Sequence, residues 1–152
     1  MLTARRRRRH GYGKVQRILA GALVALLSGG AAMAAEPAPI RLELNRLEPV
    51  EQGCRVYLVV GNEGTDPLQS LKLDLVLFRS DGVIDRRLAL ETGPLRAAKT
   101  SVKLFDLTDL PCDGLGSILV NDVLSCGASG DAGSDCFPRL ALATRTPAGF
   151  TK

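Results

Sequence analysis

Apolar and polar side chains alternate along much of the chain. Residues 40–44 and 71–77 carry Ile or Leu at every second position, with mostly polar residues between them. Because successive side chains of a strand point to opposite faces, this period of two predicts half-buried β-strands. Residues 54–60 are β-branched or apolar at nearly every position. That segment is therefore predicted to be a central strand of a sheet.

Turn signals separate these segments. Gly, Asn, Asp and Pro gather at residues 61–67, 80–82 and 92–94, where they favour turns and end strands. A weaker strand is predicted between the last two of these turns, at an edge of the sheet, because charges there deter strand addition by another chain. Those charges are Asp85, Arg86 and Arg87. A further strand is predicted over residues 100–107, with Val102 and Leu104 on one face.

The last third of the chain has a weaker pattern. Residues 115–124 fit a helical stripe as well as a strand, and the flanking glycines and the β-branched residues at 118–120 favour the strand. Leu140 and Leu142 predict a last strand, followed by a frayed tail.

About seven short strands with turns between them predict an all-β fold, an immunoglobulin-like antiparallel β-sandwich. Residues 40–152 then form a single disulfide-bonded domain. The chain has no Trp, so the Cys and Trp pattern of antibody domains is absent.

The N-terminus predicts export. Five arginines at residues 5–9, an apolar run at 18–27 and the tripeptide Ala32-Met33-Ala34 follow one another in the order of a secretory signal peptide. We expect residues 1–34 to form a helical signal peptide that is cleaved after Ala34, so that the mature chain begins at Ala35 and residues 35–39 form a linker. Cleavage after Ala35 and an uncleaved membrane anchor are the alternatives.

Removal of this segment changes the charge of the protein. The whole chain carries a net charge of +4, but seven of its 20 basic residues lie in the first 17 positions and all 16 acidic residues lie beyond residue 35. The mature chain therefore has a net charge of −3, and the basicity gives no reason to expect a nucleic-acid partner. We expect a periplasmic or secreted protein with no stable membrane anchor after cleavage.

Four cysteines lie in the mature part, at positions 54, 112, 126 and 136. An even number in a small exported chain favours two disulfides, whereas a zinc site would normally show closely spaced cysteine pairs. Cys126 and Cys136 bracket a polar loop. Cys54 begins the second predicted strand and Cys112 follows the fifth, and these strands could be antiparallel neighbours. We expect Cys54–Cys112 and Cys126–Cys136, with Cys112–Cys126 as the main rival pair.

Several short motifs of the chain resemble those of known proteins. Val60 to Gly64, the strand ending at Phe78 and Asp81-Gly82-Val83 resemble small bacterial envelope domains of the FxLYD type. Cys54, residues 76–78 and 105–107, Cys112 and Asn121-Asp122 are similar to those of uncharacterised exported proteins of proteobacteria. The resemblance implies an immunoglobulin-like fold and brings no activity with it.

Catalytic chemistry is sparse. The only His is His10, and both Met residues also precede the predicted cleavage point, so the mature chain has no histidine-based nucleophile pair. No nucleotide or hydrolase motif occurs; we expect neither an enzyme nor a cofactor. Carboxylates near Cys112 and in the cysteine loop could suit calcium or a glycosidase pair, but EF-hand spacing and sugar-stacking aromatics are missing. These carboxylates are Asp106, Asp109, Asp113, Asp131 and Asp135.

Two hypotheses of function follow. The first is a non-enzymatic interaction module that binds another envelope protein through a sheet face or edge. The second is a small secreted inhibitor or hydrolase-like factor that acts through the cysteine loop or the acidic patch. A deep polar cleft would favour the second, and a smooth sandwich with one bare edge the first.

Overall fold

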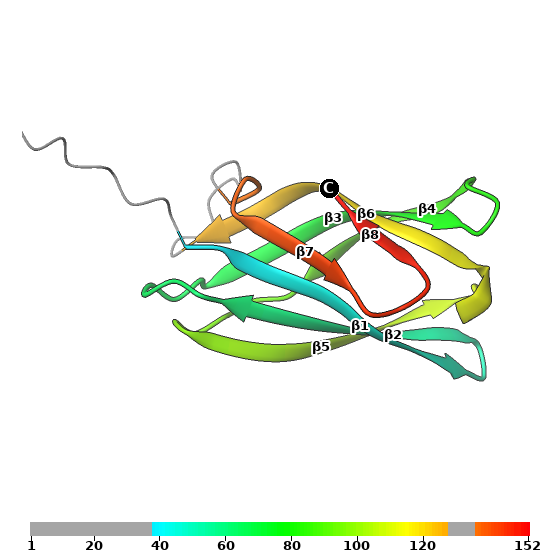
Figure 1. The fold of residues 1–152 in the computed structure, drawn as a ribbon, viewed down its shortest axis with the longest axis horizontal. Helices are drawn as coiled ribbons and strands as arrows, with labels where there is room; N and C mark the ends of the chain where they lie inside the picture. The colour runs from blue at the N-terminus through cyan, green and yellow to red at the C-terminus, as the bar shows by residue number, and fades with distance from the viewer. Residues whose placement is uncertain (1–37, 128–135) are drawn as a thin grey trace, which may run out of the picture. The chain divides into compact units, whose positions relative to one another are not determined.

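The computed structural model describes residues 38–127 and 136–152, and within them the chain forms eight β-strands and one short 3-10 helix (Figure 1). The predicted signal peptide with Ala32, Ala34 and Ala35, and the loop with Asp131 and Asp135, lie outside these residues. The elements are β1 (Ile40–Val50), β2 (Gly53–Asn62), β3 (Ser70–Arg79), β4 (Ile84–Glu91), β5 (Lys99–Thr108), η1 (Cys112–Gly114), β6 (Leu115–Gly127), β7 (Leu140–Thr144) and β8 (Gly149–Thr151).

The strands form two four-stranded sheets that pack as a β-sandwich. The first sheet has the order β5-β2-β1-β7 and the second the order β4-β3-β6-β8. The β-sandwich is confirmed, but the expectation of purely antiparallel sheets is wrong. β7 pairs parallel to β1, and β8 pairs parallel to β6. Both parallel pairs involve the C-terminal segment, whose sequence carries no signal for its sheet partner.

The alternating residues of β1 and β3 form the core. Ile40, Leu42 and Leu44 of β1 are fully buried, and so are the four leucines of β3 at positions 71, 73, 75 and 77. β2 lies between β5 and β1, which confirms the prediction of a central strand. Burial of an aliphatic side chain is favourable by about 1.5–3 kcal/mol, so these stripes hold the two sheets together.

The predicted turn and edge strand after β3 are also confirmed. The Arg79 N–H donates to the Val83 carbonyl at 2.8 Å, and Gly82 between them has a φ of +83°, a conformation that glycine adopts without strain. β4 is an edge strand of its sheet. It carries Asp85, Arg86 and Arg87, as the charge pattern predicts.

The ambiguous segment is a strand, β6. Its buried residues are spaced by three, two, three and three positions, because three register shifts interrupt its pairing with β3. Each β-bulge adds a residue to one strand and turns the next side chain to the other face. The bulges therefore give a strand the spacing of a helical stripe. The buried residues are Leu115, Ile118, Val120, Val123 and Cys126.

The expectation of a frayed C-terminal tail is wrong. Phe150 of β8 is only 8% exposed, and Ala148 before it is buried. The Lys152 ammonium donates to the Leu140 carbonyl at 2.6 Å, which ties the last residue to the start of β7. An aromatic side chain near the C-terminus thus anchors the segment in the core. Within the described ranges, no helix is long and apolar enough to cross a membrane.

Candidate functional site

The outer face of the first sheet carries an apolar patch. Val102 and Leu104 of β5 are 55% and 51% exposed. They lie opposite Val59 and Tyr57 of β2, which are partly buried. We call these four residues the outer patch. The prediction that Val102 and Leu104 share a face is correct, and the structure turns that face to solvent.

Paired charges border the outer patch on the sides away from the free edge of β5. Arg55 binds both carboxylate oxygens of Asp106, at 2.8 and 2.9 Å, across the β2–β5 pair. Arg41 binds Glu63 and Arg145 binds Glu43. The hydrogen bonds from Arg55 hold the pKa of Asp106 below its usual range. These charges are already satisfied within the sheet.

Tyr57 links the patch to this charged rim. Its hydroxyl donates to the Glu48 carboxylate, and the Arg46 guanidinium lies 5.5 Å from the centre of its ring. The hydrogen bond to Glu48 and partial removal from water raise the pKa of Tyr57. A tyrosine held in this way presents its ring as a rigid apolar contact surface.

The backbone of β5 is open along one side. The Asp109 N–H donates to the Gln52 carbonyl at 2.8 Å, and the β2–β5 register begins at the next pair, Gly53 with Thr108, and runs to Asn62 without a bulge. Bonded and non-bonded pairs alternate in an antiparallel ladder. The odd-numbered residues of β5 therefore bond to β2. The even-numbered residues, from Thr100 to Thr108, direct their N–H and C=O groups to the free edge.

A polar cluster lies on the outer face of the second sheet. Asp74 of β3 is only 3% exposed, and it accepts two hydrogen bonds from Arg87, at 2.6 and 2.7 Å, and one from Asn121 at 2.6 Å. The bonds from Arg87 lower the pKa of Asp74 despite its burial. Arg87 lies on the edge strand β4 with its side chain 64% exposed, and its guanidinium also covers this carboxylate.

The acidic residues near Cys112 do not gather into one site. Asp106 pairs with Arg55 on the outer face, whereas Asp109 and Asp113 line an open hollow of about 820 Å³ at the turn between β1 and β2. In the part of the chain that the structure describes, no three His, Cys, Asp or Glu residues are grouped to hold a metal ion. Asp131 and Asp135 lie outside that part.

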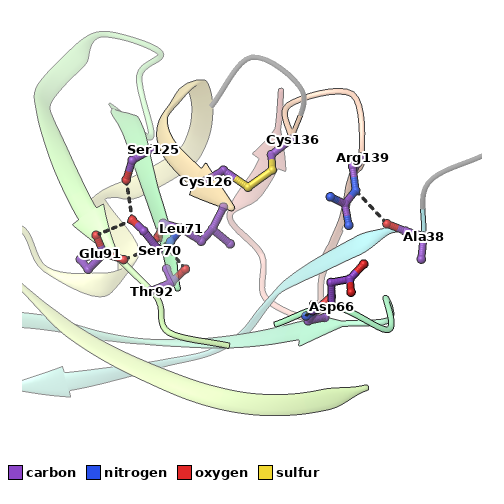
Figure 2. The surroundings of a disulfide bond; sticks show 11 residues. Ala38, Asp66, Ser70, Leu71, Glu91, Thr92, Ser125, Cys126, Cys136 and Arg139 are labelled. Atoms are coloured by element: carbon purple, nitrogen blue, oxygen red, sulfur yellow. Dashed lines mark hydrogen bonds between the residues drawn. A yellow bond between two sulfur atoms is a disulfide. The ribbon is translucent and has the colours of Figure 1, made fainter. Parts of the chain in front are cut away.

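All four cysteines form disulfides, Cys54–Cys112 and Cys126–Cys136, with Cα–Cα distances of 4.9 and 6.3 Å. This is the pairing that the strand order favours: β2 and β5 are antiparallel neighbours, so Cys54 lies opposite Leu107, near Cys112. Figure 2 shows the second bond at the end of β6, where the Ser70 and Ser125 hydroxyls also meet. The cysteines are therefore not thiolate ligands of a metal.

Two asparagines of the motifs described above, Asn62 and Asn121, have structural roles. The buried Asn62 side chain donates to the Asp66 and Arg96 carbonyls, at 2.8 and 3.3 Å, and accepts from the Gly64 N–H at 3.0 Å. These bonds hold the loop after β2. Asn121 binds Asp74 in the same supporting way. Neither residue lies in the outer patch.

Sequence reasoning missed Tyr57 and Val59 as surface residues, because β2 was expected to be apolar on both sides. In the structure Arg55, Tyr57 and Val59 alternate with buried neighbours at positions 54, 56, 58 and 60, and in the sequence only the charged Arg55 marks the outward face. The chain matches no family model, no curated protein and no solved structure.

Proposed function

We propose that this chain is a non-enzymatic interaction module of the cell envelope, which binds another envelope protein through the outer patch. The observation that carries the proposal is the exposure of Val102 and Leu104 beside Tyr57, between the free edge of β5 and a border of paired charges. An apolar centre within a polar rim is the usual anatomy of a protein interface. Exposed apolar patches on small soluble domains commonly mark such sites.

The energetics of the patch support binding. Covering a half-exposed Val or Leu removes apolar surface from water, which is favourable by about 25 cal/mol per Å². Arg55, Arg41 and Arg145 are already paired with carboxylates, so a partner need not supply charges to neutralise them. Tyr and Arg are among the residue types that most often dominate interface energetics; Tyr57 belongs to the outer patch and Arg55 adjoins it.

The cellular setting is part of the same proposal. We infer that residues 1–34 direct the chain across the inner membrane and are removed, leaving an immunoglobulin-like sandwich in the periplasm or outside the cell. Two disulfides are compatible with an oxidising compartment. An envelope protein is the class of partner that such a module meets there.

The test places a photo-crosslinking amino acid at position 104 and, as a matched control, at position 124. Leu124 is 42% exposed but lies on β6 of the other sheet. In the native envelope, we expect a discrete crosslinked protein from position 104 and none from position 124. Equal capture at both positions, or capture at neither, would contradict binding through the outer patch.

A substitution separates binding from folding. Leu104→Glu should abolish the crosslink formed from a probe at position 102, yet change stability by only about 0.5 kcal/mol, as exposed positions do. Leu75→Ala, in the core, should cost about 2–5 kcal/mol. Urea unfolding gives both values.

A further inference from the structure

The four edge strands of the sandwich differ in how well they are protected. β7 and β8 contain five and three residues. β4 contains eight, but its pairing with β3 is shifted by a bulge and it carries Asp85, Arg86 and Arg87. Short, bulged and charged edges resist the addition of another strand. β5 also carries charges, at Lys99, Lys103 and Asp106, but with ten residues and a register without a bulge it is the longest and most regular of the four edges.

The free side of β5 can accept a strand. Its even-numbered residues from Thr100 to Thr108 direct their backbone groups away from β2, and the strand contains neither Pro nor Gly. In Figure 1, β5 is the outermost strand of its sheet, at the lower side of the view. The row of unpaired N–H and C=O groups is a template for an added strand.

The side chains of β5 define what that strand should carry. Val102 and Leu104 face outward and would adjoin apolar side chains. Lys99 and Lys103 lie on the opposite face, four residues apart, and form none of the ion pairs among the described residues. Opposite charges on directly paired residues stabilise a sheet, and like charges destabilise it. Acidic side chains therefore complement the two lysines.

A second copy of this chain fits poorly. The two-fold antiparallel pairing that places Val102 against Leu104 of the other copy also places Lys103 against Lys103 of that copy. A shift by one pair in either direction removes the charge clash and pairs Val102 with Val102 or Leu104 with Leu104 of the other copy, but it sets the other apolar residue against Thr100 or Asp106. Self-pairing thus loses either part of the apolar match or the charge match.

We propose that β5 binds its partner by strand addition, and that the added segment is an extended, acidic stretch of another protein. Apolar residues of this segment lie beside Val102 and Leu104, and acidic residues lie opposite Lys99 and Lys103. The inference rests on the proposed function, which requires only that the outer patch is an interface. It specifies how the partner is held and what its chemistry is.

The test uses a synthetic ten-residue peptide in which Glu alternates with Val. The control peptides replace Glu by Lys, or carry N-methyl groups on alternate backbone amides. Binding is followed by titration calorimetry, and hydrogen exchange reports individual amides. We expect the acidic peptide to bind and to slow exchange at Thr100, Val102, Leu104 and Asp106, the amides at the free edge. The lysine and N-methylated peptides should bind more weakly.

Two variants of the protein test the same contacts. Val102→Pro removes an N–H at the free edge and keeps three aliphatic side-chain carbons, whereas Val102→Ala keeps that N–H and removes two methyl groups. The proline variant should lose binding, and the alanine variant should retain part of it. Lys103→Glu should weaken the acidic peptide about fivefold or more and favour the lysine peptide. Because the N-methylated peptide is tested on the unaltered protein, the test does not depend on whether Val102→Pro folds.

The outcomes separate the two proposals. If position 104 crosslinks a partner in the envelope but the acidic peptide neither binds nor protects the edge amides, strand addition is wrong and the interface remains. Binding that is unchanged by N-methylation or by Lys103→Glu also contradicts strand addition to an acidic segment. If position 104 captures nothing, the interface itself is wrong, whatever the peptide does.

Discussion

Asp74 lies on the outward side of its strand, yet it is almost completely covered. Three hydrogen bonds from Arg87 and Asn121 hold its carboxylate. A charged group that leaves water needs donors for its lone pairs, and these two side chains from the flanking strands supply them. Asp74 therefore joins β4, β3 and β6 on the outer face of the second sheet.

This arrangement predicts a dependence of stability on pH. The folded-state pKa of Asp74 is lowered, chiefly by the hydrogen bonds from Arg87, whereas the unfolded value is about 3.9. The ionised carboxylate thus stabilises the fold at pH values above about 4. That contribution is lost as the pH falls through the lowered folded-state value.

Urea unfolding between about pH 6 and pH 2 measures this effect. The unaltered protein should lose more stability over this range than the Asp74→Asn variant. Asp66→Asn, at an exposed loop position, is the control and should retain the full dependence. Parallel pH profiles for the unaltered protein and Asp74→Asn would exclude a stabilising role for the ionised Asp74.

Each disulfide ties a residue near one end of a strand to another segment of the chain. Cys54–Cys112 joins the start of β2 to η1 across 58 residues, and Cys126–Cys136 closes a separation of 10 residues after β6. In the chain-entropy description, a disulfide that closes a longer loop restricts the unfolded chain more.

The two bonds should therefore differ in their contributions to stability. Replacing both Cys54 and Cys112 by Ser should lower the free energy of unfolding by about 4 kcal/mol, and replacing Cys126 and Cys136 by about 3 kcal/mol. Chemical unfolding of the two double variants, compared with the unaltered protein, measures both losses. A larger loss for the Cys126 and Cys136 variant would show that native-state contacts near β6 outweigh the restriction of the unfolded chain.

The sequence predicts which segments are strands better than it predicts which face of each strand is buried. The alternation in β1 and β3 identifies each strand and its buried face, since one side is rich in Ile and Leu. In β5 the pattern identifies the strand but not its inner face, because Val102 and Leu104 alternate with Ser101, Lys103 and Phe105. The position of β5 beside β2 decides that Phe105 and Leu107 face the core. The outer patch could therefore not be assigned from the sequence.

We expect the whole domain to be released into the envelope in mature form. Purified exported protein should begin at Ala35, one residue either way, because Ala32 and Ala34 form the small-residue recognition site. N-terminal sequencing of material recovered from the envelope gives the answer. Recovery of the chain from the membrane with Met1 intact would mean that the segment is an anchor instead.

The sequence by itself determined most of the strands and the main turns. Alternation and turn residues are local properties, and local backbone preferences express them directly. The cysteine positions favoured the observed disulfide pairing, but the Cys54–Cys112 bond depends on β2 and β5 being neighbours. Only the tertiary structure decided the parallel partners of β7 and β8, the cover over Asp74 and the outward face of β5. Each of these depends on contacts between residues far apart in the chain, such as Arg87 with Asp74 and Tyr57 with Leu104, and one strand's pattern does not specify which strand will lie beside it.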